Sequence, residues 1–408
     1  VGGSQPLVLG TSASQITLKP DEFGDPYKSK LTMQRGSLTV VLDEGSLGGG
    51  ALAGQLRFQN TDLIDAGNLL GRMALALGTV LNQQHSLGLD LDGAPAGNLL
   101  TLGPIPDGLP ALANTGGASI QVAVQTTPAS GAASLSASDY EIQFTGAAAG
   151  TVRRVSDGTI TAFGSVPILV DGLSLQVTGA AAAGDRFMIT PYRQVAQSVD
   201  VAIGSPRALA VASPVVPSAG VANQGSLALQ TLIPQQAGPN LTQTVTLTFT
   251  GAGSFDVVGT GTGNPTGVAY VPGQPISYNG WALTLKGSPQ VGDTFTVQAN
   301  AYPAIDAGNA HAMLAIRDLA LFDGAATTDG YAGMMAAIGV RVQSAGFAGA
   351  VSQSIASNAA ADQAALAGVN LDEEAARMLQ FQQAYQASAK LLQVSQTLFD
   401  SLLQNLAR

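Results

Sequence analysis

Apolar side chains recur at alternating steps of three and four positions through the last forty residues. This period is the seam of an amphipathic helix that pairs with other helices as a coiled coil. Asn370, followed by Glu373, predicts the N-terminal cap, and no glycine or proline comes later. A helix over residues 369–408 would be about 50 Å long at 1.5 Å per residue. The seam positions that we expect to bind partner helices are Leu371, Met378, Phe381, Tyr385, Leu392, Phe399, Leu402 and Leu406.

The helical period also appears in three earlier stretches. It predicts helices at residues 63–86, after caps at residues 60–62, at 312–321, and at 328–366 with Thr328 as the cap. Each of these helices has an apolar face that it cannot bury against itself. We therefore expect them to form one elongated bundle with the terminal helix.

Alternating apolar and polar residues, the period of a half-buried strand, fill most of the remaining chain. Near the N-terminus they predict a small β-hairpin of residues 38–42 and 52–58 around the glycines at 48–50. The middle of the chain repeats itself at a spacing of roughly 105 to 109 residues. The matching motifs are 113–116 with 222–225, 144–146 with 249–251, 171–179 with 279–287, and 184–187 with 292–295.

The repeat predicts two small antiparallel β domains of similar fold, joined by a linker near residues 206–220 and able to fold without the helices. The predicted fold class is therefore α+β multidomain. A discontinuous helical axial domain comes from both chain ends, and the two β domains are inserted between its halves. The predicted boundaries are 1–102 and 303–408 for the helical domain, 103–205 for the first β domain and 206–302 for the second.

Composition narrows the function classes. The 408 residues include no cysteine, which excludes disulfides, cysteine-based zinc sites and thiol nucleophiles. A formal net charge of −10, without a basic stripe, argues against a nucleic-acid partner. No apolar run approaches the roughly twenty residues of a membrane span, and the first residues do not resemble a cleavable signal peptide. We expect no membrane insertion.

No catalytic motif is visible, so we expect neither an enzyme nor a cofactor, although carboxylates could still converge in space as they do in glycosidases. Asp90 and Asp92 suggest a calcium loop but lack its other ligands, so a capped turn is the better interpretation. His85 has no neighbouring ligand, which favours a surface or packing role over a metal site. The glycine-rich residues 259–267 are followed by a β-like segment rather than a helix, which favours a hairpin loop over a nucleotide site.

The amino-acid sequence of the terminal helix also resembles that of a known protein family. Residues 368–376 and 378–387, the latter reading Met-Leu-Gln-Phe-Gln-Gln-Ala-Tyr-Gln-Ala, closely resemble the C-terminal signature of flagellar axial proteins. Within that family the wording is most similar to the proteins of the hook–filament junction. Phe58, His85 and the loop at 88–93 resemble the middle of the same proteins. Members begin with a further helical region, so the resemblance implies that this chain is a fragment of a longer protein.

The resemblance implies a structural adaptor of the bacterial flagellum that self-assembles into a ring, so that the filament can attach to the hook. Its implied location is extracellular, reached through the flagellar export apparatus without a cleavable signal peptide. The implied partners are copies of itself, the hook protein, hook-associated protein 3, and a cytoplasmic export chaperone that binds the C-terminal helix. The alternatives are another axial protein, of the hook or rod, and a secreted β-rich adhesin or glycan-binding protein.

Overall fold

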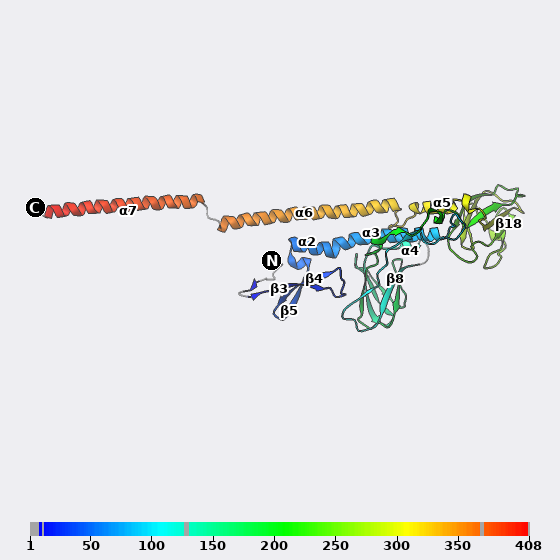
Figure 1. Cartoon of the computed structure of the whole chain (residues 1–408), viewed down its shortest axis with the longest axis horizontal. Coiled ribbons are helices and arrows are strands. Elements are labelled where there is room, and N and C mark those ends of the chain that lie inside the picture. The colour runs from blue at the N-terminus through cyan, green and yellow to red at the C-terminus, as the bar shows by residue number, and fades with distance from the viewer. Residues whose placement is uncertain (1–7, 10–11, 126–129, 368–370, 407–408) are drawn as a thin grey trace. The chain divides into compact units, whose positions relative to one another are not determined.

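A computed structural model describes residues 8–9, 12–125, 130–367 and 371–406 of the chain (Figure 1). The chain forms two compact units, residues 1–341 and 342–408. The first unit contains the β-sheets and the helices up to the first turns of α6 (Thr327–Ala367). The second contains the rest of α6 and all of α7 (Leu371–Leu406). The α+β multidomain fold class is confirmed, whereas the domain boundaries stay a prediction.

The N-terminal segment forms a small sheet rather than the expected hairpin. Strands β3 (Gln15–Pro20), β4 (Ser29–Arg35) and β5 (Leu38–Leu42) are antiparallel in that order, beside the short pair β1 (Val8–Leu9) and β2 (Ser12–Ala13). The predicted strand 38–42 is therefore β5. Its hydrogen-bonded neighbour is β4, which the sequence analysis did not predict.

Residues 52–58 were expected to be a strand, and this prediction is wrong. After α1 (Glu44–Leu47), the helix α2 (Ala51–Arg57) continues through a π turn, η1 (Phe58–Asp62), into α3 (Leu63–Ser86). The segment begins Ala-Leu-Ala, and alanine and leucine are among the strongest helix formers. The predicted bounds of α3 hold, but residues 60–62 lie inside the continuous helix and cannot cap it.

The helix α3 is a core helix of the first unit. Leu75, Ala76 and Val80 are buried on it. A Cβ added at Gly71 would lie 2.3 Å from the carbonyl oxygen of Tyr192, so only glycine permits this close approach of the two segments. The buried face explains why an apolar helix of this length does not need a membrane.

The first β module lies between residues 109 and 189. One sheet has the strand order β11-β10-β9-β14-β7 and the other β12-β13-β8, all antiparallel. The short helix α4 (Ser130–Ala133) lies between β8 and β9 in sequence. The strands are β7 (Leu109–Pro110), β8 (Ser119–Val124), β9 (Tyr140–Gly146), β10 (Ala149–Arg154), β11 (Ile160–Phe163), β12 (Ile168–Val170), β13 (Leu173–Thr178) and β14 (Arg186–Ile189).

The second β module, between residues 215 and 299, has the same topology. Its sheets have the orders β20-β19-β18-β23-β16 and β21-β22-β17, which match the first module strand for strand. Residues 259–267 join β19 to β20, which pair as an antiparallel hairpin. The strands are β16 (Val215–Ala219), β17 (Ala228–Pro234), β18 (Val245–Gly251), β19 (Ser254–Val258), β20 (Val268–Ala269), β21 (Pro275–Tyr278), β22 (Trp281–Lys286) and β23 (Thr294–Ala299).

The repeated sequence motifs form the same hydrogen bonds in both modules. Asn114 donates to the carbonyl of Arg186 and accepts from its N–H, both at 2.8 Å, and Asn223 does the same with Thr294. Asp185 accepts backbone N–H groups of residues 115, 116 and 182, and Asp293 accepts those of 224, 225 and 290. These bonds hold the pKa of both carboxyls below the usual value. The repeat therefore preserves the polar network that fixes the loop before β8 and β17.

The two modules differ in how their cores end. The core of the first continues into the helices, with Ile120 and Phe187 in one cluster with Leu75 of α3 and with Phe322. The core of the second, around Phe249 and Trp281, is a separate cluster that contains only residues of that module. The expectation that the β domains fold alone therefore has structural support for the second module.

The connections hold the second module at two adjacent points of the chain. Asn300 donates through its Nδ2 to the carbonyl of Ser213 at 2.9 Å, and the Ser213 N–H donates to Asp306 at 2.7 Å. The expected linker at 206–220 is shorter than predicted, since Pro217 lies in β16. This strand is at the edge of its sheet, where proline is tolerated. The remaining short elements are β6 (Leu100–Thr101), β15 (Asp200–Val201), η2 (Val195–Ser198), η3 (Pro206–Ala208) and η4 (Pro303–Ile305).

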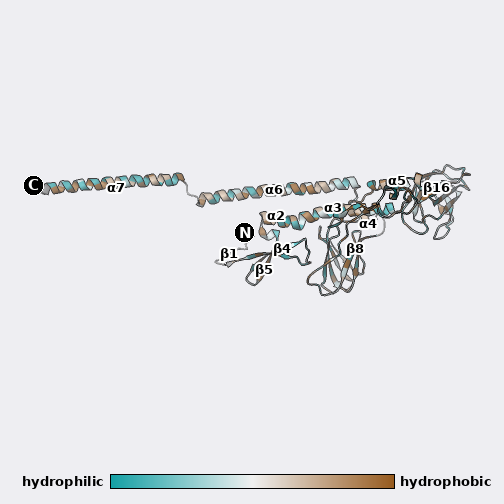
Figure 2. Cartoon of the chain, in the orientation of Figure 1, coloured by the Kyte–Doolittle hydropathy of each residue, from teal (hydrophilic) through white to brown (hydrophobic). Residues whose placement is uncertain are grey.

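Three helices follow the second module. The expected helix 312–321 begins and ends earlier than predicted, as α5 (Gly308–Ala315) and the turn η5 (Ile316–Asp318). The long helices are α6 (Thr327–Ala367) and α7 (Leu371–Leu406), so Thr328 lies within the first turn of α6 instead of capping it. Figure 2 shows apolar and polar residues alternating along both.

The expectation about membrane spans concerned uninterrupted apolar runs, whereas the average composition of a helix is a separate property. Among the described residues, two parts of the chain have helices that are apolar enough by length and composition to span a membrane, Ala51–Ser86 and the described helical residues between Thr327 and Gln404. The first supplies core residues to a folded unit, as described above. Core helices of water-soluble proteins can have the same length and composition, so these two properties alone do not identify a membrane-spanning helix.

Candidate assembly surface

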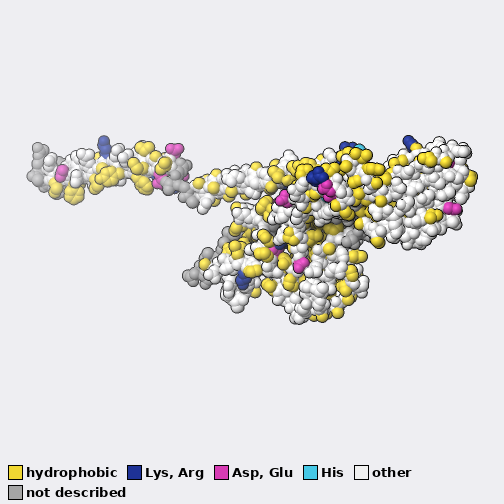
Figure 3. Space-filling view, turned by 45° about the vertical axis from the view of Figure 1, so that its right-hand side comes forward, with side chains coloured by type: hydrophobic (Ala, Val, Ile, Leu, Met, Phe, Trp, Pro, Cys, Tyr) yellow, Lys and Arg dark blue, Asp and Glu magenta, His cyan; other side chains and the backbone are white. Residues whose placement is uncertain are grey.

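The seam of α7 is exposed along its described length. Every side chain from residue 371 to 404 is exposed, and seven of the eight predicted seam residues expose 59–79% of their surface. Leu406 belongs to the helix, but its side chain lies outside the described residues. Figure 3 shows hydrophobic side chains gathered along this helix. Their role as a binding site stays a prediction.

The part of α6 in the second unit carries a comparable set of exposed apolar residues. Val342, Phe347, Ile355 and Leu366 expose between 63% and 91% of their surface. The sequence analysis placed a helix here but left these residues out of the candidate surface. Their spacing on an alanine-rich helix was the signal that could have included them.

Local interactions alone do little to stabilise α7. Arg377 lies 3.6 Å from Glu373 and 3.5 Å from Glu374 in the first turn, and all three side chains are mostly exposed. Exposed ion pairs of this kind contribute at most about 1 kcal/mol. The predicted cap, Asn370, lies outside the described residues. A helix of this length therefore gains most of its stability from packing its apolar face against partners.

The first turns of α6 are fixed within the first unit. Arg341 donates to Asp62 at 3.1 Å and to Asp65 at 2.8 Å, which joins α6 to the helix that contains α3. Met334 is buried, and a Cβ on Gly330 would lie 2.7 Å from the Phe322 ring. These contacts anchor the N-terminal part of α6, up to Arg341, within the first unit.

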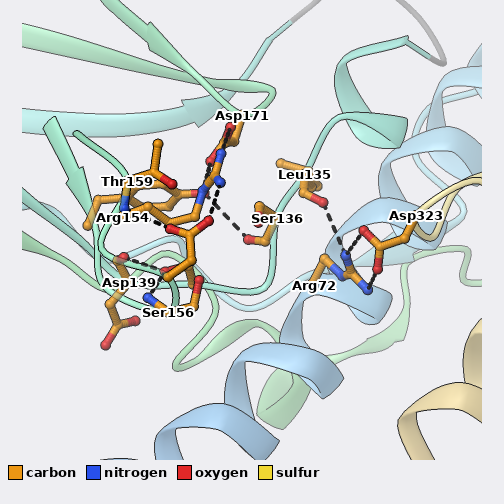
Figure 4. Close-up of polar contacts among 12 residues, drawn as sticks. Arg72, Leu135, Ser136, Asp139, Arg154, Ser156, Thr159, Asp171 and Asp323 are labelled. Atoms are coloured by element: carbon orange, nitrogen blue, oxygen red, sulfur yellow. Dashed lines mark hydrogen bonds and ion pairs between the residues drawn. The ribbon is translucent and has the colours of Figure 1, made fainter. Parts of the chain in front are cut away.

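A polar cluster joins α3 to the first β module (Figure 4). Arg72, which is nearly buried on α3, forms two bonds of 2.9 Å with the carboxylate of Asp323 and a longer one of 3.4 Å with the carbonyl of Leu135. A guanidinium that binds a carboxylate through two nitrogens fixes orientation as well as distance. This contact ties the helix to two segments that are distant in sequence.

The neighbouring carboxyls in Figure 4 are also structural. Asp171 accepts hydrogen bonds from the Tyr140 hydroxyl and Arg154 Nε, both at 2.8 Å. Burial raises the pKa of Asp139 to about 6. Raised carboxyl pKa values are common in active sites, but Asp139 and Tyr140 expose only 4% and 0% of their surface. A substrate has no access to them.

His85 and the Asp90 loop have protein partners. The His85 ring is fully buried, with Nδ1 2.8 Å from the Gly97 carbonyl, and its Nε2 accepts the N–H of Ala210 at 3.0 Å. Its proton is therefore on Nδ1, and its role is in packing. Asp90 accepts the N–H groups of Asp92 and residue 94, as in the capped turn that we preferred. In the described ranges, no three His, Asp or Glu side chains are grouped to hold a metal ion.

Three protein families match parts of the sequence. The flagellar hook-associated protein FlgK helical domain matches residues 1–100, and the D2-like domain of flagellar hook-associated protein 1 matches 112–191. The C-terminal family of flagellar basal body rod FlgEFG proteins matches 363–405. The last match covers α7 up to residue 405 and therefore includes seven of the eight seam residues, all except Leu406.

Individual relatives match nearly the whole chain. Flagellar hook-associated protein 1 of Escherichia coli is 25% identical over 401 residues, and that of Salmonella typhimurium is 23% identical over 402. Both alignments cover 97% of this chain but 57% of the relative, so the chain spans little more than half of their length. The structure of the flagellar hook junction protein FlgK from Burkholderia pseudomallei is 26% identical, with a TM-score of 0.71. That match covers 91% of this chain and 73% of the other.

Proposed function

Because this chain belongs to the family of flagellar hook-associated protein 1, we propose that it is a structural adaptor at the junction of the flagellar hook and filament. The observation that carries the proposal is the structural likeness to a flagellar hook junction protein over 91% of the chain. This likeness includes both the helical and the β-rich parts, whereas a short signature match would concern α7 alone.

The exposed seam of α7 supports self-assembly as the mode of action. An apolar stripe of this length is unfavourable in water and is typical of a surface that binds another protein. We propose that copies of the chain pack side by side into a ring through this seam, with the helical part inward and the β modules outward. The same seam, before assembly, would bind a cytoplasmic export chaperone.

The further partners that we propose are the hook protein and hook-associated protein 3. The location that follows is the bacterial flagellum outside the cell, reached through the flagellar export apparatus and without insertion into a membrane. The proposed role is structural rather than enzymatic, and it needs no cofactor. A secreted adhesin would leave the exposed helical seam and the family matches at both chain ends unexplained.

Deleting the gene for this chain in its host tests the proposal. The expected result, seen by electron microscopy, is cells that carry hooks without attached filaments. Since the match at residues 363–405 is to rod proteins, the main alternative is a hook or rod protein. Loss of the hooks themselves would favour that alternative, and normal filaments would contradict both.

A further inference from the structure

The two β modules share a topology, and each has a tight turn at the same corner. In the first module the hairpin turn between β12 and β13 is covered. A Cβ on Gly172 would lie 3.3 Å from the buried Leu135 side chain, and Asp171 binds Tyr140 and Arg154. The equivalent turn of the second module, between β21 and β22, adopts the same left-handed conformation at residues 279 and 280 and is also covered, since a Cβ on Gly280 would lie 2.4 Å from the Gln236 carbonyl oxygen.

Above the turn of the second module there is an open pocket of about 630 Å³. Twelve residues line it, including the partly exposed Tyr278 and side-chain amides and hydroxyls such as those of Gln236, Asn240 and Ser277, whereas the Trp281 ring behind them is fully buried. None of the twelve residues that line it carries a charge. Small-molecule sites in proteins combine aromatic walls with a few polar groups in this way.

Trp281 provides a second observation. It is the only tryptophan of the chain and is fully buried, with its ring 6.1 Å from that of Tyr278 in an edge-on arrangement. Its indole N–H has no acceptor among the described residues. Buried donors of this type are nearly always satisfied, by protein, water or ligand, because leaving one unpaired is costly. Because the indole has no exposed surface, a ligand oxygen can supply the missing acceptor only if the residues that cover the indole move aside.

The lining indicates the class of ligand. Amide groups both donate and accept hydrogen bonds, and hydroxyls do the same, so they suit a ligand that also presents hydroxyls. The partly exposed ring of Tyr278 offers an apolar wall for the C–H face of such a ligand. The lack of charge among the lining residues gives no means of binding a phosphate or a carboxylate strongly.

We propose that this pocket of the second β module binds an uncharged saccharide ring. The aromatic side of the pocket packs against the ring's C–H face, and Asn240 and its neighbours bind the hydroxyls. The site involves no residue of the α7 seam. It therefore stands or fails independently of the role of the chain in the flagellum.

The single tryptophan makes a direct test possible. The full chain, labelled with ¹⁵N, gives one indole N–H signal in a correlation spectrum. The probes are the methyl glycosides of glucose, galactose and mannose, and N-acetylglucosamine, each titrated to about 10 mM to detect millimolar dissociation constants. Glycerol serves as a control for a polyol without a ring.

At least one saccharide should shift the indole signal saturably, whereas glycerol should not. Asn240→Ala should weaken that binding by about tenfold, as expected for a lost hydrogen bond. The matched control Gln224→Ala changes an exposed amide in the loop before β17 and should leave binding unchanged. The unshifted indole signal of each variant reports that the module is folded. Either of two results overturns the proposal. One is that no saccharide shifts the indole signal, and the other is that Asn240→Ala and Gln224→Ala bind the saccharide with equal affinity.

Discussion

Replacing Leu392, Phe399 and Leu402 of α7 by serine should impair assembly at the junction. These three residues expose 67%, 67% and 59% of their surface, so a partner can cover about two-thirds of each. Complete burial of such a side chain is worth about 1.5–3 kcal/mol, and two-thirds of that is about 1–2 kcal/mol. The triple variant should therefore lose about 3–6 kcal/mol of association free energy. At 1.4 kcal/mol per factor of ten, binding should weaken by about a hundredfold to ten-thousandfold.

The assay restores the variant to a strain that lacks the gene. Incorporation into purified hook–filament structures, measured by immunoblotting against the unassembled pool, gives the fraction assembled, and swimming motility gives the physiological effect. The matched control is the triple replacement of Gln386, Gln393 and Gln404 by serine, on the polar side of the same helix. This control also changes three residues but removes no apolar side chain.

Folding must be separated from assembly in this experiment. The substituted residues lie in the second unit, whereas Trp281 is buried in the first, so its fluorescence should be the same in all three proteins. The reasoning is refuted if the triple variant is exported, joins the junction and supports motility as the unaltered protein does. Equal impairment by the glutamine variant would also refute it, since the effect would then not come from apolar burial.

Three further outcomes follow from the structure. Asp139→Asn should raise the free energy of unfolding at neutral pH by up to about 3 kcal/mol, because the carboxyl pKa is about 6 when folded and 3.8 otherwise. Above pH 6 the buried carboxyl is ionised and destabilises the unaltered chain, so the difference in free energy of unfolding between the two proteins should decrease as the pH falls and vanish below 3.8. A difference in denaturant titrations that is equal at neutral pH and below pH 3.8 contradicts the raised pKa of Asp139. The excised second module, residues 213–301, should unfold cooperatively when followed by Trp281 fluorescence; a gradual change would show that its core depends on the helices. Calorimetric titration with calcium should detect no micromolar site at Asp90, whose Oδ1 already accepts two backbone N–H groups.

Periodicity over long stretches predicted the helices well. The bounds of α3 and the continuity of α7 followed from apolar spacing, because a helix of many turns repeats its signal. The strand predicted at 52–58 failed because seven residues contain too few repeats to separate the two periods, and helix-forming Ala51 and Leu52 were decisive. The sheet partner β4 was missed because strand pairing depends on contacts that are distant in sequence.

The repeat was informative down to single residues. Equivalent positions of the repeat hold the same residues and form the same hydrogen bonds, namely Asn114 with Asn223 and Asp185 with Asp293. What the repeat could not reveal was that the two cores end differently. Sequence similarity between the modules says nothing about which of them continues into α3.

The anchoring of the second module has a practical consequence. Its two ends are joined by the bond between Asn300 and the carbonyl of Ser213, and its core is its own. We therefore expect that a foreign domain with equally close termini can replace this module while the helices assemble unchanged. If the proposed arrangement with outward β modules holds, such a chimera displays its cargo on the outside of the flagellum at a defined position. Motility of cells carrying it would measure how freely this part of the chain can diversify.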